Sequence, residues 1–336
     1  MAPRIIIPLA AEIRHDFIAI DEGLAQLLRV NESDPSKNWI VKIAPAAPAG
    51  VERSPEWNVA ARDMQLVGGN RILVSHDAGY TEFDIATGKI CAEIATYQGV
   101  ATARRLPSGH TLIAGVGLDG SRGVVVLEID ETNTIHHKTV FPGDYIRLIR
   151  ETAQGTWLMM NNTMIREGAR SGRILHEWSV PGFKHGWKAV RLANGHILSS
   201  AGYGAFLVEL DADGRELRRF AEREKMPAAI NANFYAMFQL LPNGHVVIAN
   251  WQAHGPGHGE SGIQLFELDP NSNIVWQWSD ARIISSLQGV LVLDGLDPSF
   301  LHDERTGVMA PVAMSAMPYM STQQRTAQEL IAFNPK

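Results

Sequence analysis

The chain has 336 residues, 45% hydrophobic and 20% charged, with a formal net charge of −6 at pH 7. This is an ordinary globular composition, and its acidic balance argues against a nucleic-acid partner. No apolar run approaches the ~20 residues of a membrane-spanning helix, so no membrane insertion is expected. The N-terminal MAPRIIIPLAAEIRHD is too short and too soon charged for a secretory signal, which favours a cytoplasmic location, or a periplasmic one if a leader has been removed. The single Cys91 excludes an internal disulfide.

The first predicted strands lie in residues 17–43, where FIAIDEGLAQLLRVNESDPSKNWIVKI reads as three strands separated by turns. A pattern of strand, glycine turn and strand then recurs, with LLPNGHVVIAN (240–250) as a clear copy. The turn glycines follow one another at intervals of 40, 46, 40 and 49 residues; they are Gly69, Gly109, Gly155, Gly195 and Gly244. A period near forty with apolar strands is typical of the blades of a β-propeller.

Each repeat continues with a second hairpin, as in VELDADGREL (208–217), so one repeat holds four strands, A to D. Residues 17–43 supply only strands B, C and D, and SSLQGVLVLDGLD (285–297) supplies the missing strand A as a Velcro closure. The sequence therefore predicts an all-β fold, a single six-bladed propeller over residues 15–297. Residues 298–336 are predicted to be an extension that wraps the propeller, with a short helix near 326–332.

Propeller geometry separates the candidate functional residues from the structural ones. Strand A lines the central channel and starts at the face that carries the B–C loops, which we call the top. His110, His196 and His245 directly follow turn glycines, so they are expected at the bottom rim as hairpin ends. The stretch NWQAHGPGHGESGIQ (250–264) is a top-face loop with nine extra residues, since 25 residues separate Gly244 from Asp269 but only 16 separate Gly195 from Asp211. Loops on a rigid scaffold commonly carry binding residues.

The channel mouth is therefore the predicted site for a small-molecule substrate. The residues predicted to be catalytic are His254, His258, His185 and Tyr203. The residues predicted to bind substrate are His76, Arg62, Arg104, Arg147, Lys188, Asn161, Asn250, Trp251, Gln252, Tyr235 and Gln288. Trp57 and Asn58 are expected at the same face, at the start of a strand A.

Several basic residues in the A strands point to an anionic ligand, because arginine suits carboxylate, sulfate or phosphate groups. The alternative is pairing with Asp63, Glu151 or other strand carboxylates. The histidines leave three roles open: metal ligation by His254 and His258, general acid–base catalysis, and nucleophilic catalysis. The glycines between His254 and His258 indicate a loop, so helical metal-ligand spacing does not apply. No cofactor is firmly predicted, and a divalent metal ion remains an alternative.

The pattern LPNGHxxIA followed by ELDxxG resembles the PQQ-like and arylsulfotransferase-like propeller repeats of bacteria, over roughly residues 17–297. The arylsulfotransferase resemblance implies a catalytic histidine and basic sulfate ligands, roles open to His254 or His185 with Arg104 or Arg147. We expect an enzyme that acts on a small polar or anionic, carbohydrate-derived substrate by histidine and tyrosine acid–base chemistry, as a lyase, hydrolase or isomerase. The alternative is a non-catalytic propeller that serves as a ligand-binding or protein-interaction scaffold.

Overall fold

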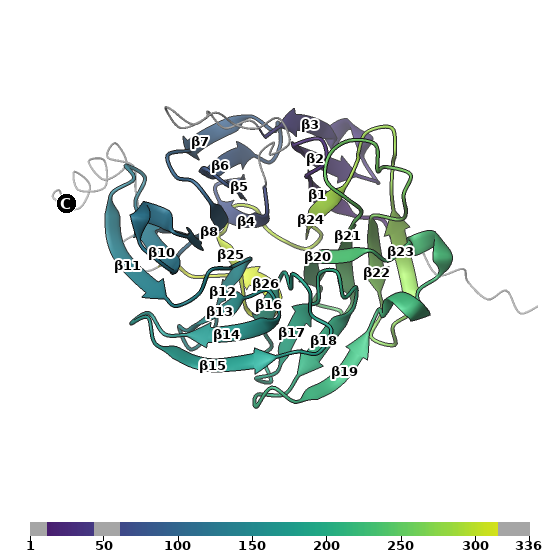
Figure 1. The fold of residues 1–336 in the computed structure, drawn as a ribbon. Coiled ribbons are helices and arrows are strands. Elements are labelled where there is room, and N and C mark those ends of the chain that lie inside the picture. The colour runs from purple at the N-terminus through teal and green to yellow at the C-terminus, as the bar shows by residue number, and fades with distance from the viewer. Residues whose placement is uncertain (1–11, 44–60, 315–336) are drawn as a thin grey trace, which may run out of the picture.

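The computed structural model describes residues 12–43 and 61–314. Its strands form six sheets arranged as blades around a central channel (Figure 1). The predicted all-β, six-bladed propeller with four antiparallel strands per blade is confirmed. Helical structure in these two ranges is limited to four short 3-10 turns. None of the described helices is long and apolar enough to cross a membrane.

The blades follow the chain in order. Blade 1 contains β1 (Asp16–Asp21), β2 (Gln26–Asn31), β3 (Trp39–Lys42) and β24 (Leu287–Val292). Blade 2 contains β4 (Asp63–Gly68), β5 (Arg71–His76), β6 (Gly79–Asp84) and β7 (Ile90–Ile94). Blade 3 contains β8 (Val100–Arg105), β9 (Thr111–Val116), β10 (Val124–Ile129) and β11 (Ile135–Phe141). Blade 4 contains β12 (Ile149–Glu151), β13 (Trp157–Met160), β14 (Met164–Gly168) and β15 (Ile174–Ser179). Blade 5 contains β16 (Ala189–Arg191), β17 (Ile197–Ser200), β18 (Leu207–Leu210) and β19 (Glu216–Phe220). Blade 6 contains β20 (Phe234–Leu240), β21 (Val246–Trp251), β22 (Leu265–Leu268) and β23 (Ile274–Trp278).

The repeated glycines make the turns at the bottom of the blades. Gly109, Gly155, Gly195 and Gly244 have φ between +75° and +88°, a region that side chains with a Cβ rarely adopt. In each of these turns the glycine N–H donates to the carbonyl three residues earlier, as Gly109 does to Leu106. The turn geometry therefore explains why glycine recurs at this position and why the histidine after it ends a hairpin.

The hydrophobic core lies between neighbouring blades rather than within one of them. One cluster joins Ile18 and Ile20 of blade 1 with Met64 and Val74 of blade 2, and all four side chains are fully buried. Burying such a side chain contributes ~1.5–3 kcal/mol, so these blade-to-blade contacts stabilise the ring. The outermost strands are more exposed; four of the five residues of β7 face solvent.

Blade 1 combines the first three strands of the chain with a strand from much later in the sequence. Strand β24 pairs antiparallel with β1, with Phe17 opposite Val292, and forms the innermost strand of that sheet. Figure 1 shows this late strand beside the first strands of the chain.

The described part of the C-terminal extension, residues 298–314, contacts the inner strands of the ring. Strand β26 (Val308–Pro311) adds to the channel edge of β20, and β25 (His302–Thr306) contacts β4, β12 and β16 at the centre of Figure 1. The Gly69 N–H donates to the Ser299 carbonyl, which places the start of the extension at the bottom turns. Strands β25 and β26 therefore lie in the lower channel. The helix expected near 326–332 falls outside the described residues.

Candidate functional site

The register of the inner hairpins places three functional candidates at one level of the channel. The backbone N–H groups of Arg62, Arg147 and Trp187 each donate to a carbonyl at the upper end of the strand B of their own blade. The accepting residues are Ser75 of β5, Met160 of β13 and Ser200 of β17. The three candidates therefore share a level near the top of the channel, on blades 2, 4 and 5.

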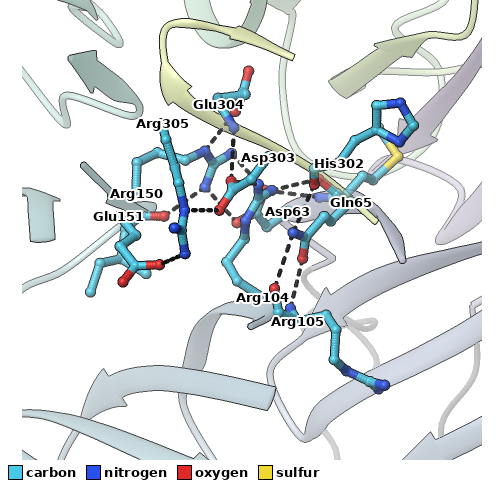
Figure 2. Close-up of polar contacts among 12 residues, drawn as sticks. Asp63, Gln65, Arg104, Arg105, Arg150, Glu151, His302, Asp303, Glu304 and Arg305 are labelled. Atoms are coloured by element: carbon cyan, nitrogen blue, oxygen red, sulfur yellow. Dashed lines mark hydrogen bonds and ion pairs between the residues drawn. The ribbon is translucent and has the colours of Figure 1, made fainter. Parts of the chain in front are cut away.

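A buried ion-pair network fills the channel below that level (Figure 2). The Arg150 guanidinium donates to both oxygens of Asp63 at 2.8 Å and, through Nε, to Glu304 at 2.7 Å. Lys188 Nζ donates to Glu304 at 2.5 Å, and Arg104 donates to Asp303 at 2.5 Å. Burial alone would raise the pKa of Glu304, but the charges of Lys188 and Arg150 lower it to about 2.

The network changes the interpretation of two predicted substrate-binding residues. Arg104 and Lys188 face carboxylates of their own chain, and three cations balance three carboxylates: Arg104, Arg150 and Lys188 with Asp63, Asp303 and Glu304. For these side chains the structure shows the carboxylate pairing that was the alternative to ligand binding. The sequence analysis anticipated Asp63 but missed Asp303 and Glu304, whose only signal was the charged run HDERT in the tail.

The two arginines at the mouth have a different environment. Arg62 and Arg147 donate only to backbone carbonyls, those of Val100 and Ile146, and no carboxylate of the described residues pairs with either. Burial and the nearby Arg147 charge lower the pKa of Arg62 to about 10, and burial also lowers the pKa of Arg147. The Arg147 guanidinium lies 4.3 Å above the Tyr145 ring centroid. Both arginines remain charged near pH 7 and available to an anion.

His185 lies beside these arginines in a constrained loop. Its Nδ1 is 3.2 Å from the Tyr145 hydroxyl, and its backbone N–H donates to Asn162 Oδ1 at 2.8 Å. The backbone of His185 has φ +57°, an unusual conformation that is commonly found at functional sites. Burial and the positive charges of Arg147 and Lys184 lower the pKa of His185, so its imidazole is neutral near pH 7.

His254 reaches the same mouth from the long B–C loop, with the opposite electrostatic setting. Its Nδ1 donates to Glu22 Oε1 at 2.8 Å, and the Trp251 indole donates to the other oxygen of Glu22 at 3.1 Å. The hydrogen bond to Glu22 raises the pKa of His254. The His254 side chain is 72% exposed, so it can meet a ligand from solvent.

A wall of aromatic rings connects the two histidines. Tyr203 lies 5.6 Å from His185 and 6.2 Å from Trp251, and Trp251 lies 4.6 Å from His254, measured between ring centroids. Phe234 packs below, 4.7 Å from the Tyr203 ring. The predicted residues that meet at the mouth are thus Arg62, Arg147, His185, Tyr203, Trp251 and His254. Glu22 and Tyr145, which hold the two histidines, were not among the predicted site residues.

Other predicted residues shape the loops rather than the mouth. The Asn250 amide donates to the carbonyls of Ile230 and Ile263, and the Gln252 amide donates to those of Asn231 and Asn250. These bonds fix the fold of the long loop.

The remaining predicted residues occupy separate places. Tyr235 is fully buried against Phe266, and His76 is fully buried beside Thr81. Asn161 accepts a hydrogen bond from its neighbour Asn162. Gln288 is buried on the innermost strand of blade 1. Trp57 and Asn58 lie outside the described residues.

The structure does not bring His254 and His258 together as a pair of metal ligands. The His258 N–H donates to the Ser285 hydroxyl, and no contact joins the two histidine side chains. Across the described ranges no group of three or more His, Cys, Asp or Glu side chains is arranged to hold a metal ion.

Comparisons with known proteins support the fold. No protein-family model matches the chain, and no curated protein matches it in sequence. A crystal structure of a protein of unknown function from Bacteroides caccae is similar, with a TM-score of 0.65 and 21% identity over 83% of this chain and 99% of that one. A catalytically inactive virginiamycin B lyase from Staphylococcus aureus with quinupristin has a TM-score of 0.49 at 12% identity, covering 82% of this chain and 88% of that one. Regucalcin, a calcium-binding protein from Agrobacterium tumefaciens, has a TM-score of 0.47 at 13% identity, covering 83% and 92%. These likenesses concern the propeller alone, and the resemblance to PQQ-like and arylsulfotransferase-like repeats is not confirmed.

Proposed function

We propose that the protein is an enzyme that acts on a small anionic organic substrate at the top mouth by acid–base catalysis. The observation that carries this proposal is the pair of mouth arginines, Arg62 and Arg147, which lack carboxylate partners among the described residues and lie beside the His185–Tyr145 pair. Uncompensated guanidinium groups favour an anion, and a neutral histidine next to them can accept a proton.

The two histidines have complementary protonation states. The pKa of His185 is lowered and that of His254 is raised, an arrangement in which one group acts as the base and the other as the acid. In the tautomer that would act as the base, Nδ1–H of His185 donates to the Tyr145 hydroxyl oxygen and Nε2 carries the lone pair that accepts a proton.

A β-elimination is the reaction that uses every part of the site. The arginines would hold the substrate carboxylate, and His185 would take the proton from the carbon next to it. That electron pair would form the new C=C bond as the bond to the β-oxygen breaks, and protonated His254 would give its proton to the leaving oxygen. Isomerisation would use the same proton abstraction with return of the proton to a neighbouring carbon.

A substrate screen tests the proposal directly. Uronic acids and their glycosides would be incubated with the enzyme, with elimination followed by the ultraviolet absorbance of the conjugated double bond and isomerisation by NMR. We expect turnover that is lost in His185→Asn and Arg147→Gln but kept in Arg218→Gln, a change on the outer strand β19. Turnover that survives both mouth substitutions would contradict the assignment, as would the absence of turnover with every anionic substrate.

A further inference from the structure

The mouth contains buried polar atoms that no described residue satisfies. Two are hydrogen-bond donors, Arg147 Nε and Trp187 Nε1, and two are acceptors, Asp77 Oδ1 and Gln288 Oε1. Trp187 is 3% exposed and Gln288 is 5% exposed. Buried polar groups are almost always paired in folded proteins, so four such atoms in one region indicate a missing partner.

The four atoms come from four blades around the same opening. Trp187 and Arg147 share a level of the channel, and the guanidinium carbon lies 5.5 Å from the indole centroid. Asp77 follows β5 at the top of blade 2, where its charge acts on Arg62. Gln288 lies near the top end of β24, two residues after Ser286, whose hydroxyl accepts the N–H groups of Gln252 and Ala253. The unpaired atoms therefore surround the upper channel.

The chemistry of these atoms defines the ligand. The two donors lie among positive charges and suit the oxygens of an anion, whereas the two acceptors need hydrogen-bond donors such as hydroxyl groups. Glu22 is paired with His254, and the Asp77 carboxylate acts on Arg62, so Arg147 is the arginine left for one planar anionic group such as a carboxylate.

We infer that the mouth binds a polyhydroxy monocarboxylate, such as a uronic acid, with its carboxylate at Arg147 and Trp187 and its hydroxyls at Asp77 and Gln288. This inference rests on the proposed function for the location of the site. It adds the substrate class and the individual roles of Asp77 and Trp187 in binding.

Binding calorimetry with matched ligands tests the inference. The probes are D-glucuronate, D-galacturonate and D-mannuronate, compared with cyclohexanecarboxylate, methyl glucoside and glucose 6-phosphate. Cyclohexanecarboxylate lacks the hydroxyls and methyl glucoside lacks the carboxylate. Glucose 6-phosphate carries a dianionic phosphate in place of the carboxylate. We expect at least one uronate to bind ~10-fold or more tightly than every comparator, because each comparator lacks the hydroxyls or the carboxylate, or carries a larger group with a different charge in its place.

Two conservative substitutions sharpen the test. Trp187→Phe keeps an aromatic ring but removes the N–H, and should weaken the uronate ~3- to 10-fold. Gln288→Leu should weaken the uronate by a similar factor and leave cyclohexanecarboxylate unchanged, since that ligand has no hydroxyl to lose. Thermal unfolding of each variant confirms that it is folded, and Arg218→Gln serves as the neutral control.

The outcomes separate this inference from the proposed function. Selective uronate binding without turnover of any uronate supports the inference and contradicts the enzyme proposal. Turnover of a phosphate or sulfate ester in place of uronates supports an enzyme and overturns the inference. Equal binding of the comparators, or no uronate binding by the folded protein, overturns the inference as well.

Discussion

Arg147 and Arg150 lie three residues apart on the inner wall of blade 4, yet they have opposite surroundings. Arg150 is bound by Asp63 and Glu304, and these carboxylates raise its pKa despite complete burial. Arg147 contacts no carboxylate of the described residues, and burial lowers its pKa. The difference is made by Asp303 and Glu304 of the C-terminal extension, which pair with the lower cations Arg104, Arg150 and Lys188. These lower cations are part of the fold, whereas Arg62 and Arg147 have no such carboxylate partner among the described residues.

The largest expected effect is on the lower network. Glu304→Gln keeps the size of the side chain but removes the charge that pairs with Arg150 and Lys188. Removing one partner from a buried ion pair typically destabilises a protein by ~3–5 kcal/mol, because the other charges stay buried. Urea unfolding of both proteins measures the difference.

The control for this change is Glu216→Gln, which breaks an exposed pair with Arg219 on β19. Exposed pairs contribute little, so this variant should lose less than ~1 kcal/mol. If Glu304→Gln lost no more than this control, the lower network would not be part of what stabilises the fold.

A second cluster extends the comparison to the junction of blades 1 and 6. His15 lies between Asp294 and Glu267, at 2.7 Å from the latter. Burial alone would lower the pKa of His15, but hydrogen bonds to these carboxylates raise it from 6.5 to about 9. A raised pKa means that the stabilisation is complete below about pH 6.5 and is lost as the pH rises through about 9.

We therefore expect the wild type to lose ~2–3 kcal/mol relative to His15→Gln when the pH is raised from below 6.5 to above 9. The free energy of unfolding is measured for both proteins at both pH values. Subtracting the change in the variant from the change in the wild type isolates His15, because the contributions of the other titrating groups cancel. Parallel pH profiles for the two proteins would show that His15 is not held protonated by its neighbours.

The blades could be predicted from the sequence because the residues that determine each hairpin lie next to one another in the chain. A turn that requires a left-handed glycine recurs every forty to fifty residues, and apolar strands flank it, so Gly109 and Gly195 mark their hairpins without any knowledge of the rest. The top-face position of His254 followed from loop length in the same way.

The sequence could not show which arginines pair with carboxylates, because those carboxylates lie far from the arginines in the chain. Arg104 meets Asp303 across 199 residues, and nothing near Arg104 distinguishes it from Arg147. The tail HDERT has weak periodicity, which hid a strand that enters the channel. Glu22 was missed for a similar reason, since it acts through a histidine from another blade.

The two histidines of the mouth give a smaller, electrostatic prediction. Glu22→Gln removes the carboxylate that raises the pKa of His254, so this pKa should fall, whereas that of His185 should stay where it is. Titration of the histidine ring protons by NMR measures both. If His254 is the acid of the proposed reaction, the alkaline limb of the pH–rate profile should move to lower pH in this variant. An unchanged limb together with a lowered pKa would remove His254 from that role.

The smallest effect on stability is expected for Arg147→Gln, and its value lies in the contrast with Arg150→Gln. Arg147 Nε is buried without a partner, so the substitution removes a costly group along with a stacking contact to Tyr145, and the free energy of unfolding should change by less than ~1 kcal/mol. Arg150→Gln should cost ~3–5 kcal/mol, since it leaves Asp63 and Glu304 undercompensated. Binding of a uronate should show the reverse order at temperatures where both variants are folded, with a loss in Arg147→Gln and near-normal affinity in Arg150→Gln. Equal losses of stability in the two variants would mean that the upper arginine is also a structural residue, and the division of the channel into a structural and a binding half would fail.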